Sequence, residues 1–182
     1  GSRLVIVPDG DNKSGHAIVN AIAAVGVTHL DMTPSQIRHV LGTLALEGSG
    51  AIDRTINRLL VASEVLSPEL ARHCRDAIPG LDAIIHMYGK TEIGGSVSVR
   101  PLAACDFQAG ALPLSEPFAP FGSAFARTDD GDTELLIGGL TRDDLVLTEN
   151  GIEQTGQVRP FAGPGLWHAT GDHVRLGSEG EF

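Results

Sequence analysis

The sequence predicts an α/β fold in which helices flank a mainly parallel sheet, followed by a small β-rich subdomain. Over about the first 110 residues, short apolar runs bounded by turn residues alternate with segments of helical periodicity. Beyond them the prolines accumulate and the helical period fades. With 182 residues and 42% hydrophobic content, the chain can bury a sizeable core.

The first lobe is expected to contain four strands joined by connections of helix length, an arrangement typical of a parallel sheet. The expected strands are residues 3–7, 28–32, 59–62 and 83–87. The expected helices are residues 16–25, a helix capped by Thr33 or Ser35 that continues to Leu44, and one opened by Ser67 and Pro68. Such sheets bind ligands beyond the carboxyl ends of their strands, where Asp31, Ser63 and Tyr88 are expected.

The second lobe is expected to begin near residue 112, which divides the chain into residues 1–112 and 113–182. Four prolines lie between residues 101 and 120, and this connection is expected to be ordered. Residues 134–138 and 168–176 are typical of β-strands. We therefore expect a mostly antiparallel β unit.

Charge and composition exclude several classes of partner. The net charge of −10 opposes binding to nucleic acid, and no apolar run reaches the roughly 18 residues that a membrane span needs. Cys74 and Cys105, without a signal peptide, predict a cytoplasmic protein and no disulfide scaffold. The histidines have no spacing typical of a zinc site, so no structural metal is expected.

The most specific segment is residues 86–92, His-Met-Tyr-Gly-Lys-Thr-Glu, in which a strand leads into a polar turn. The aromatic face of Tyr88 can stack on adenine, and the Thr91 hydroxyl can bond a phosphate oxygen. The Glu92 carboxylate can hold the Mg²⁺ that neutralises a polyphosphate. One short turn could therefore serve a whole nucleotide.

This segment resembles the signature of adenylate-forming enzymes, which is Asn, any residue, then Tyr-Gly-Pro-Thr-Glu. Tyr88, Gly89, Thr91 and Glu92 match it, whereas His86 and Lys90 replace the usual Asn and Pro. The resemblance implies that Tyr88 packs on adenine, Thr91 contacts the α-phosphate and Glu92 coordinates Mg²⁺. A His at position 86 can bind the adenine amino group only in the right tautomer.

Four other segments resemble family motifs in the same order, namely residues 26–35, 58–66, 134–139 and 167–175. The resemblance implies that the turn at Ala62, Ser63 and Glu64 lies against the adenine. It also implies that Asp172, in a Thr-Gly-Asp turn, hydrogen-bonds the ribose hydroxyls. Together the five motifs resemble the adenylation domain of nonribosomal peptide synthetases, of which this chain would be an internal fragment of the large N-terminal lobe.

The resemblance also implies a pocket for the substrate side chain, lined by Asp31, Leu59, Val61, Met87, Gly95 and Ser96. A carboxylate in an otherwise apolar wall is costly unless it is paired, so Asp31 predicts a basic or amine-bearing substrate. The alternative is that Asp31 caps the helix that starts near Pro34.

The complete enzyme is therefore expected to form aminoacyl-AMP from an amino acid and ATP. It would then load the phosphopantetheine thiol of a carrier protein, as in the biosynthesis of peptide antibiotics. The family's phosphate loop and catalytic lysine are not found here, so the chain alone is expected to be inactive. A fragment of an acyl-CoA or aryl-acid ligase and a noncatalytic, degenerate module are the alternatives.

Overall fold

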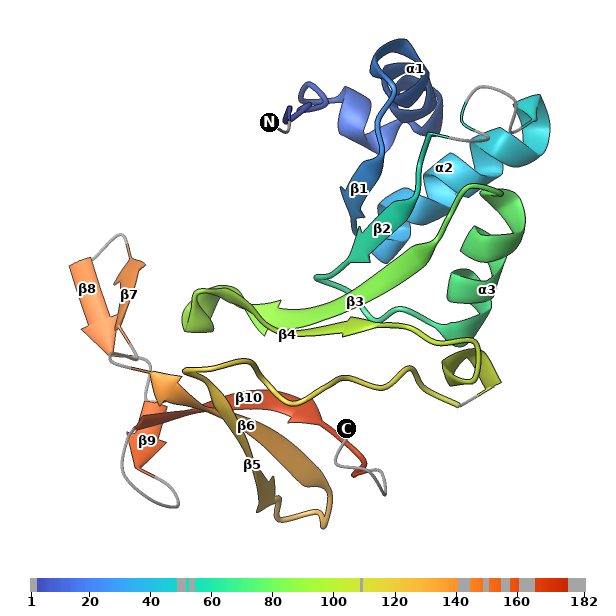
Figure 1. Cartoon of the computed structure of the whole chain (residues 1–182). Helices are drawn as coiled ribbons and strands as arrows, with labels where there is room; N and C mark the ends of the chain where they lie inside the picture. The colour runs from blue at the N-terminus through green and yellow to red at the C-terminus, as the bar shows by residue number, and fades with distance from the viewer. Residues whose placement is uncertain are drawn as a thin grey trace. The chain divides into compact units, whose positions relative to one another are not determined.

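The computed structural model forms two compact units, shown in Figure 1. It describes residues 3–48, 52, 55–108, 110–140, 145–148, 151–154, 158–160 and 166–176. The first unit comprises Gly1–Met87 and Arg100–Leu112, and the second comprises Tyr88–Val99 and Pro113–Phe182. The chain thus passes from one unit to the other within strand β3 and returns within strand β4.

The first unit is built on parallel strands that alternate with helices. Its elements are α1 (Gly15–Val25), β1 (His29–Met32), α2 (Pro34–Glu47), β2 (Arg58–Val61), α3 (Pro68–Ala77) and the first part of β3 (Ala83–Lys90), with the short helices η1 (Asp11–Lys13) and η3 (Asp106–Gln108). β2 pairs in parallel with both β1 and β3, and β4 (Gly95–Pro101) completes the sheet in the order β1-β2-β3-β4. The expected α/β class with a mainly parallel sheet is confirmed.

Local sequence signals fix where the three helices begin. The Ser14 hydroxyl caps α1, and Ser67 caps α3, where Pro68 supplies the first helical position. At α2 the cap is reciprocal: the Thr33 hydroxyl accepts from the Gln36 amide at 3.3 Å, and the Gln36 side chain accepts from the Thr33 amide at 3.0 Å. Thr33, and not Asp31, therefore caps this helix, so the capping alternative for Asp31 is wrong.

The core of the first unit joins one face of the parallel sheet to the apolar faces of the helices. Leu59, Val61 and Ile84 on the sheet belong to the same buried cluster as Ile22 of α1 and Leu41 of α2. Each such side chain contributes about 1.5–3 kcal/mol when it is buried. The free energy of this packing fixes the positions of β1, β2 and β3 in the sheet.

The second unit is the antiparallel β unit that the sequence predicts. Its elements are η2 (Thr91–Ile93), β5 (Gly122–Arg127), β6 (Thr133–Leu140), β7 (Leu145–Thr148), β8 (Gly151–Gln154), β9 (Val158–Pro160) and β10 (Leu166–His173). One sheet has the order β5-β6-β10-β9, and β7 pairs with β8. Leu135 and Ile137 of β6 are fully buried with Ile93 and Val97.

Residues 3–7 differ from the prediction, because they form no strand. A strand needs a hydrogen-bonded neighbour, and the described residues supply no strand that pairs with this segment. Leu4 and Ile6 are accordingly 84% and 79% exposed. The sheet of the first unit thus has three parallel strands instead of the four expected. Its remaining strand, β4, was not among the expected strands.

Two further observations concern membranes and metals. Among the described residues, no helix is both long and apolar enough to cross a membrane. The same residues contain no group of three or more His, Cys, Asp and Glu side chains that could hold a metal ion. Cys74 and Cys105 are both free thiols, and burial raises the pKa of Cys74 to about 12.

The capping box at α2 gives a direct test of helix stability. Thr33→Ala removes the hydroxyl that accepts from the Gln36 amide and should lower the free energy of unfolding by about 1 kcal/mol. Asp31→Ala is the matched control and should leave that free energy unchanged within about 0.5 kcal/mol. Urea unfolding followed by circular dichroism measures both, and an equal loss in the two variants would contradict the assignment of the cap.

Candidate functional site

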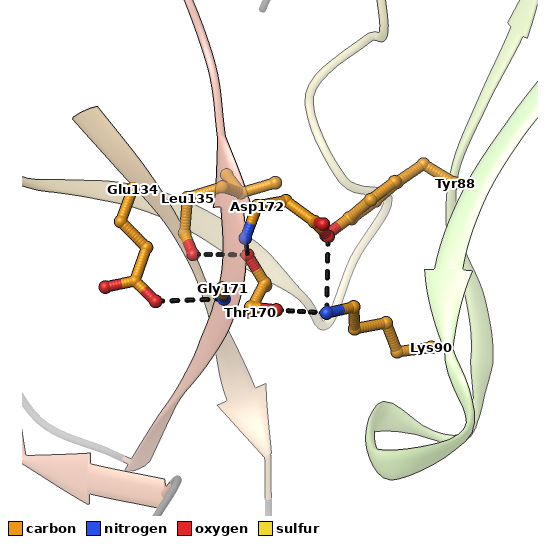
Figure 2. Close-up of polar contacts among 7 residues, drawn as sticks. All are labelled: Tyr88, Lys90, Glu134, Leu135, Thr170, Gly171 and Asp172. Carbon is orange, nitrogen blue, oxygen red and sulfur yellow. Dashed lines mark hydrogen bonds and ion pairs between the residues drawn. The ribbon is translucent and has the colours of Figure 1, made fainter. Parts of the chain in front are cut away.

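The polar cluster of the second unit joins the tip of the β3–β4 hairpin to the end of β10 (Figure 2). The Tyr88 hydroxyl donates a hydrogen bond of 2.6 Å to Oδ2 of Asp172. The ammonium of Lys90 lies 3.4 Å from the same oxygen and donates to the backbone carbonyl of Thr170. Two side chains from the hairpin therefore converge on one carboxylate oxygen.

The turn that carries Asp172 is held by its own side chains. Gly171 has a φ of 72°, which favours glycine, and its amide donates to the Glu134 carboxylate at 2.9 Å. The buried Thr170 hydroxyl donates to the Leu135 carbonyl at 2.8 Å and accepts from the Asp172 amide at 3.1 Å. The pairing of β10 with β6 shifts register between Ala169 and His173, so Thr170, Gly171 and Asp172 lie in an irregularity of the strand.

The Asp172 carboxylate is held at one oxygen and available at the other. Its side chain is 44% exposed, and Oδ1 receives no hydrogen bond from any residue that the structure describes. An ionised carboxylate makes the stronger, charge-assisted kind of hydrogen bond. The arrangement therefore offers an acceptor of fixed direction to a ligand hydroxyl, such as that of a sugar.

Tyr88 is both a packing residue and a neutral donor. Its ring packs against the buried cluster that contains Ile93, Val97 and Ile137. Burial of the phenol, followed by its hydrogen bond to Asp172, raises the pKa of Tyr88 well above its ordinary value. The hydroxyl consequently keeps its proton and donates to the carboxylate.

The hairpin turn explains why a glycine stands at position 89. A Cβ there would lie 1.9 Å from the carbonyl oxygen of Gly95, so no side chain fits.

Thr91 and Glu92 follow in η2 and are both exposed. Within the described residues Glu92 forms no hydrogen bond or ion pair, so its exposed carboxylate is available to a ligand.

In the first unit, the strand register decides which predicted pocket residues share a face. Asp31 pairs with Leu60, and Leu60 pairs with Ile85. Paired residues point to the same side of the sheet, so Asp31 and Leu60 share one face, and Met87, two residues beyond Ile85, lies on it too.

Leu59 and Val61 point to the opposite face, where they are 1% and 0% exposed in the core. This geometry favours Leu60 over Leu59 and Val61 as the neighbour of Asp31. The sequence reading missed Leu60, although the alternation along Arg58–Val61 could have indicated it.

The turn after β2 contains Ser63, whose backbone is strained, and Glu64, whose carboxylate is hydrogen-bonded to α2. Ser63 has a φ of 72°, and no other non-glycine residue in the described part of the chain has a positive φ. The Glu64 carboxylate accepts from the Ser35 hydroxyl at 2.6 Å and from the Ser35 amide at 3.1 Å, and the hydroxyl contact is the main cause of its lowered pKa. Glu64 thus binds the first turn of α2, where a negative charge is favourable.

The remaining predicted residues divide between the two units. Ala62 follows β2, and His86, half-buried, pairs with Val61 and lies on that residue's side of the sheet. Gly95 and Ser96 lie in the second unit, at the start of β4. A groove of about 920 Å³ in the first unit includes Asp31 and Leu60, but α1, β1 and residues 3–7 form most of its wall.

Comparison with known proteins agrees with this fold. The family model of AMP-binding enzymes matches residues 1–116. One of the proteins of mycosubtilin synthase from Bacillus subtilis is 27% identical over 200 residues, which cover the whole chain but 7% of that protein. The chain therefore spans only a small part of this curated relative.

Solved structures show the same fold at lower identity. The nonribosomal peptide synthetase FmoA3 with bound α-methyl-L-serine-AMP superposes with a TM-score of 0.74, at 19% identity, over 97% of this chain and 21% of that one. The adenylation domain AlmE of Vibrio cholerae, in complex with glycyl-adenosine-5′-phosphate, has a TM-score of 0.72 at 17% identity, over 96% of this chain and 34% of its own.

The chain belongs to the AMP-binding enzyme family. Its resemblance to the adenylation domains of nonribosomal peptide synthetases is confirmed.

His168 is a buried titratable group in the strand that carries Asp172. Its side chain lies in β10 and is 2% exposed, and its Nδ1 atom has no hydrogen-bond partner among the described residues. Burial lowers the pKa of His168, although the carboxylate of Glu92 acts in the opposite direction. The imidazole is therefore neutral in the folded protein near pH 7.

Protonation of His168 should destabilise the folded chain. Because its pKa is lower in the folded state, the associated stability is complete above about pH 6.5, the unfolded value, and is lost as the pH falls below it. His168→Gln should therefore lose less stability than the wild type between about pH 7.5 and about pH 5.5. Urea midpoints at the two pH values test this, with the exposed His73→Gln as control; identical losses in wild type and His168→Gln would contradict it.

Proposed function

We propose that this chain carries the nucleotide-binding and substrate-selecting parts of an amino-acid adenylation domain, which forms aminoacyl-AMP from an amino acid and ATP. The observation that carries the proposal is the Asp172 carboxylate, which is held at Oδ2 and free at Oδ1. A carboxylate in this state suits a ribose hydroxyl, because its acceptor oxygen already has a fixed direction. The family membership supports an adenine nucleotide as the ligand.

In this proposal the hairpin binds the rest of the nucleotide. Tyr88 packs beside the adenine, and the exposed Thr91 hydroxyl donates to the α-phosphate. The free carboxylate of Glu92 holds Mg²⁺, which neutralises the charge on the phosphates when it is bound. Gly89 allows the close backbone approach that forms the turn.

The first unit supplies the turn beside the adenine and the pocket for the substrate side chain. Ala62 and Ser63 are proposed to lie against the adenine, and Glu64 supports their turn through Ser35. His86 and Met87, which point to opposite sides of the sheet, are proposed to contact the adenine from the end of β3. For the side-chain pocket of the first unit we propose Asp31, Leu60 and Met87, which lie on one sheet face. Leu60 thereby takes the place expected for Leu59 and Val61.

A basic amino acid is the proposed substrate. Asp31 is exposed at the carboxyl end of β1, and within the described residues it has no hydrogen bond or ion pair. A substrate ammonium or guanidinium group would provide the partner that this carboxylate lacks here.

The acyl group is then proposed to pass to the phosphopantetheine thiol of a carrier protein. One solved relative, PA1221, contains adenylation and PCP domains.

Nucleotide binding tests the proposed site. Titration of the chain with ATP and Mg²⁺ should give measurable heat, and Asp172→Asn should weaken the affinity by about tenfold or more, because a charge-assisted hydrogen bond is lost. Tyr88→Phe should weaken it by less, since the ring remains. Asp82→Asn, an exposed site in the first unit, is the matched control.

Two outcomes would count against this site. If the folded wild-type chain binds no nucleotide, the cluster around Asp172 is at most a scaffold. If Asp172→Asn and Asp82→Asn bind ATP with the same affinity, the nucleotide does not contact the Asp172 carboxylate.

The proposed role of Asp31 predicts a change in substrate preference. In the complete enzyme, Asp31→Asn should reduce the preference for arginine or ornithine over neutral amino acids by about tenfold, because a charged hydrogen bond is removed. Amino-acid-dependent exchange of pyrophosphate into ATP measures this preference. An unchanged ratio in Asp31→Asn would rule out the pairing, and Asp82→Asn controls for loss of surface charge.

A further inference from the structure

Lys90 is one of only two lysines in the chain, and it stands beside the most polar contacts of the site. Its ammonium lies 3.4 Å from Oδ2 of Asp172 and also donates to the carbonyl of Thr170. Its side chain is 31% exposed. As Figure 2 shows, Lys90 reaches from the hairpin to the turn that presents Asp172.

The two contacts of Lys90 restrain different parts of the same turn. The bond to the Thr170 carbonyl fixes the backbone before Asp172, whereas the ion pair restrains the carboxylate itself. Tyr88 alone makes one hydrogen bond to Oδ2, about which the carboxylate could still rotate. The ion pair with Lys90 draws the same oxygen toward the hairpin and so restrains this rotation, which leaves Oδ1 as the oxygen that a ligand meets.

A lysine near a nucleotide could instead bind phosphate directly, as a point charge. This ammonium already donates a hydrogen bond to the Thr170 carbonyl and forms an ion pair with the Asp172 carboxylate. Both partners belong to the turn assigned to the ribose. This placement favours an action of Lys90 through Asp172 over a direct contact with phosphate.

We propose that Lys90 is a positioning residue that orients the Asp172 carboxylate toward the ribose hydroxyls of the nucleotide. The proposal rests on the proposed function, because it requires that a nucleotide binds at Asp172. It makes Lys90 a determinant of how strongly the protein discriminates a ribose from a sugar without hydroxyls.

The contact itself can be tested without any nucleotide. Trace acetylation with acetic anhydride, read by mass spectrometry, compares the reactivity of Lys90 with that of Lys13, an exposed lysine in η1. Asp172→Asn should raise the reactivity of Lys90 at least about twofold relative to Lys13, because an ion-paired ammonium reacts less readily. An unchanged ratio would overturn the proposal at its first step.

The effect on ligands is tested with two nucleotides, AMP and 2′,3′-dideoxy-AMP. Lys90→Met should weaken AMP binding by up to about fivefold, the range of a partly exposed ion pair, and leave dideoxy-AMP binding unchanged. Lys90→Arg should restore most of the AMP affinity, since it keeps the charge and the donors. Lys13→Met is the matched control and should change neither affinity.

The pattern of results separates the two proposals. Equal weakening of both nucleotides by Lys90→Met would show a phosphate contact or a disturbed fold and would overturn the positioning role. If the wild type binds AMP and Lys90→Met binds it equally well, the role of Lys90 fails while the proposed function stands. If the folded wild type binds neither nucleotide, the proposed function fails, and the positioning role fails with it.

Discussion

The hydrogen bond from Tyr88 to Asp172 is the interaction on which the proposed site depends. It joins residues 84 positions apart, one in a hairpin and one in a bulged turn of β10. Burial of the phenol raises the pKa of Tyr88, which favours the protonated hydroxyl that donates to the carboxylate. Without this bond the turn could still form, because Thr170 and Gly171 hold it from β6, but its carboxylate would have no fixed direction.

The parallel register of β1, β2 and β3 imposes a second constraint, within the first unit. It divides the strand residues between a core face and an open face, and a carboxylate can lie only on the latter. Asp31 accordingly alternates with the buried Leu30 and Met32. The same alternation places Leu60, and not its two neighbours, beside Asp31.

Local patterns in the sequence predicted most of the fold, because caps, apolar runs and glycines act over a few residues. The helices after Ser14, Thr33 and Ser67 followed from such signals. Residues 3–7 show the limit, since their apolar pattern is that of a strand but pairing depends on a distant neighbour.

In the site, too, short motifs predicted single residues but not the contacts between segments that are far apart in the sequence. Sequence motifs marked Tyr88 and Asp172 separately, but the contact of Lys90 with both Asp172 and Thr170 depends on the fold of the second unit. The choice between Leu60 and its neighbours required the register of β2, which short motifs do not contain. Long-range geometry was therefore the part that the sequence could not provide.

The close packing at Gly89 also restricts how this hairpin can evolve. The carbonyl of Gly95 occupies the space where any side chain would begin, so position 89 is closed to substitution. The adjacent Lys90 side chain, by contrast, extends from the hairpin and reaches Thr170. Sequence variation in the turn is thus directed to positions such as 90, where a new side chain can alter the chemistry of the site without disturbing the backbone that forms it.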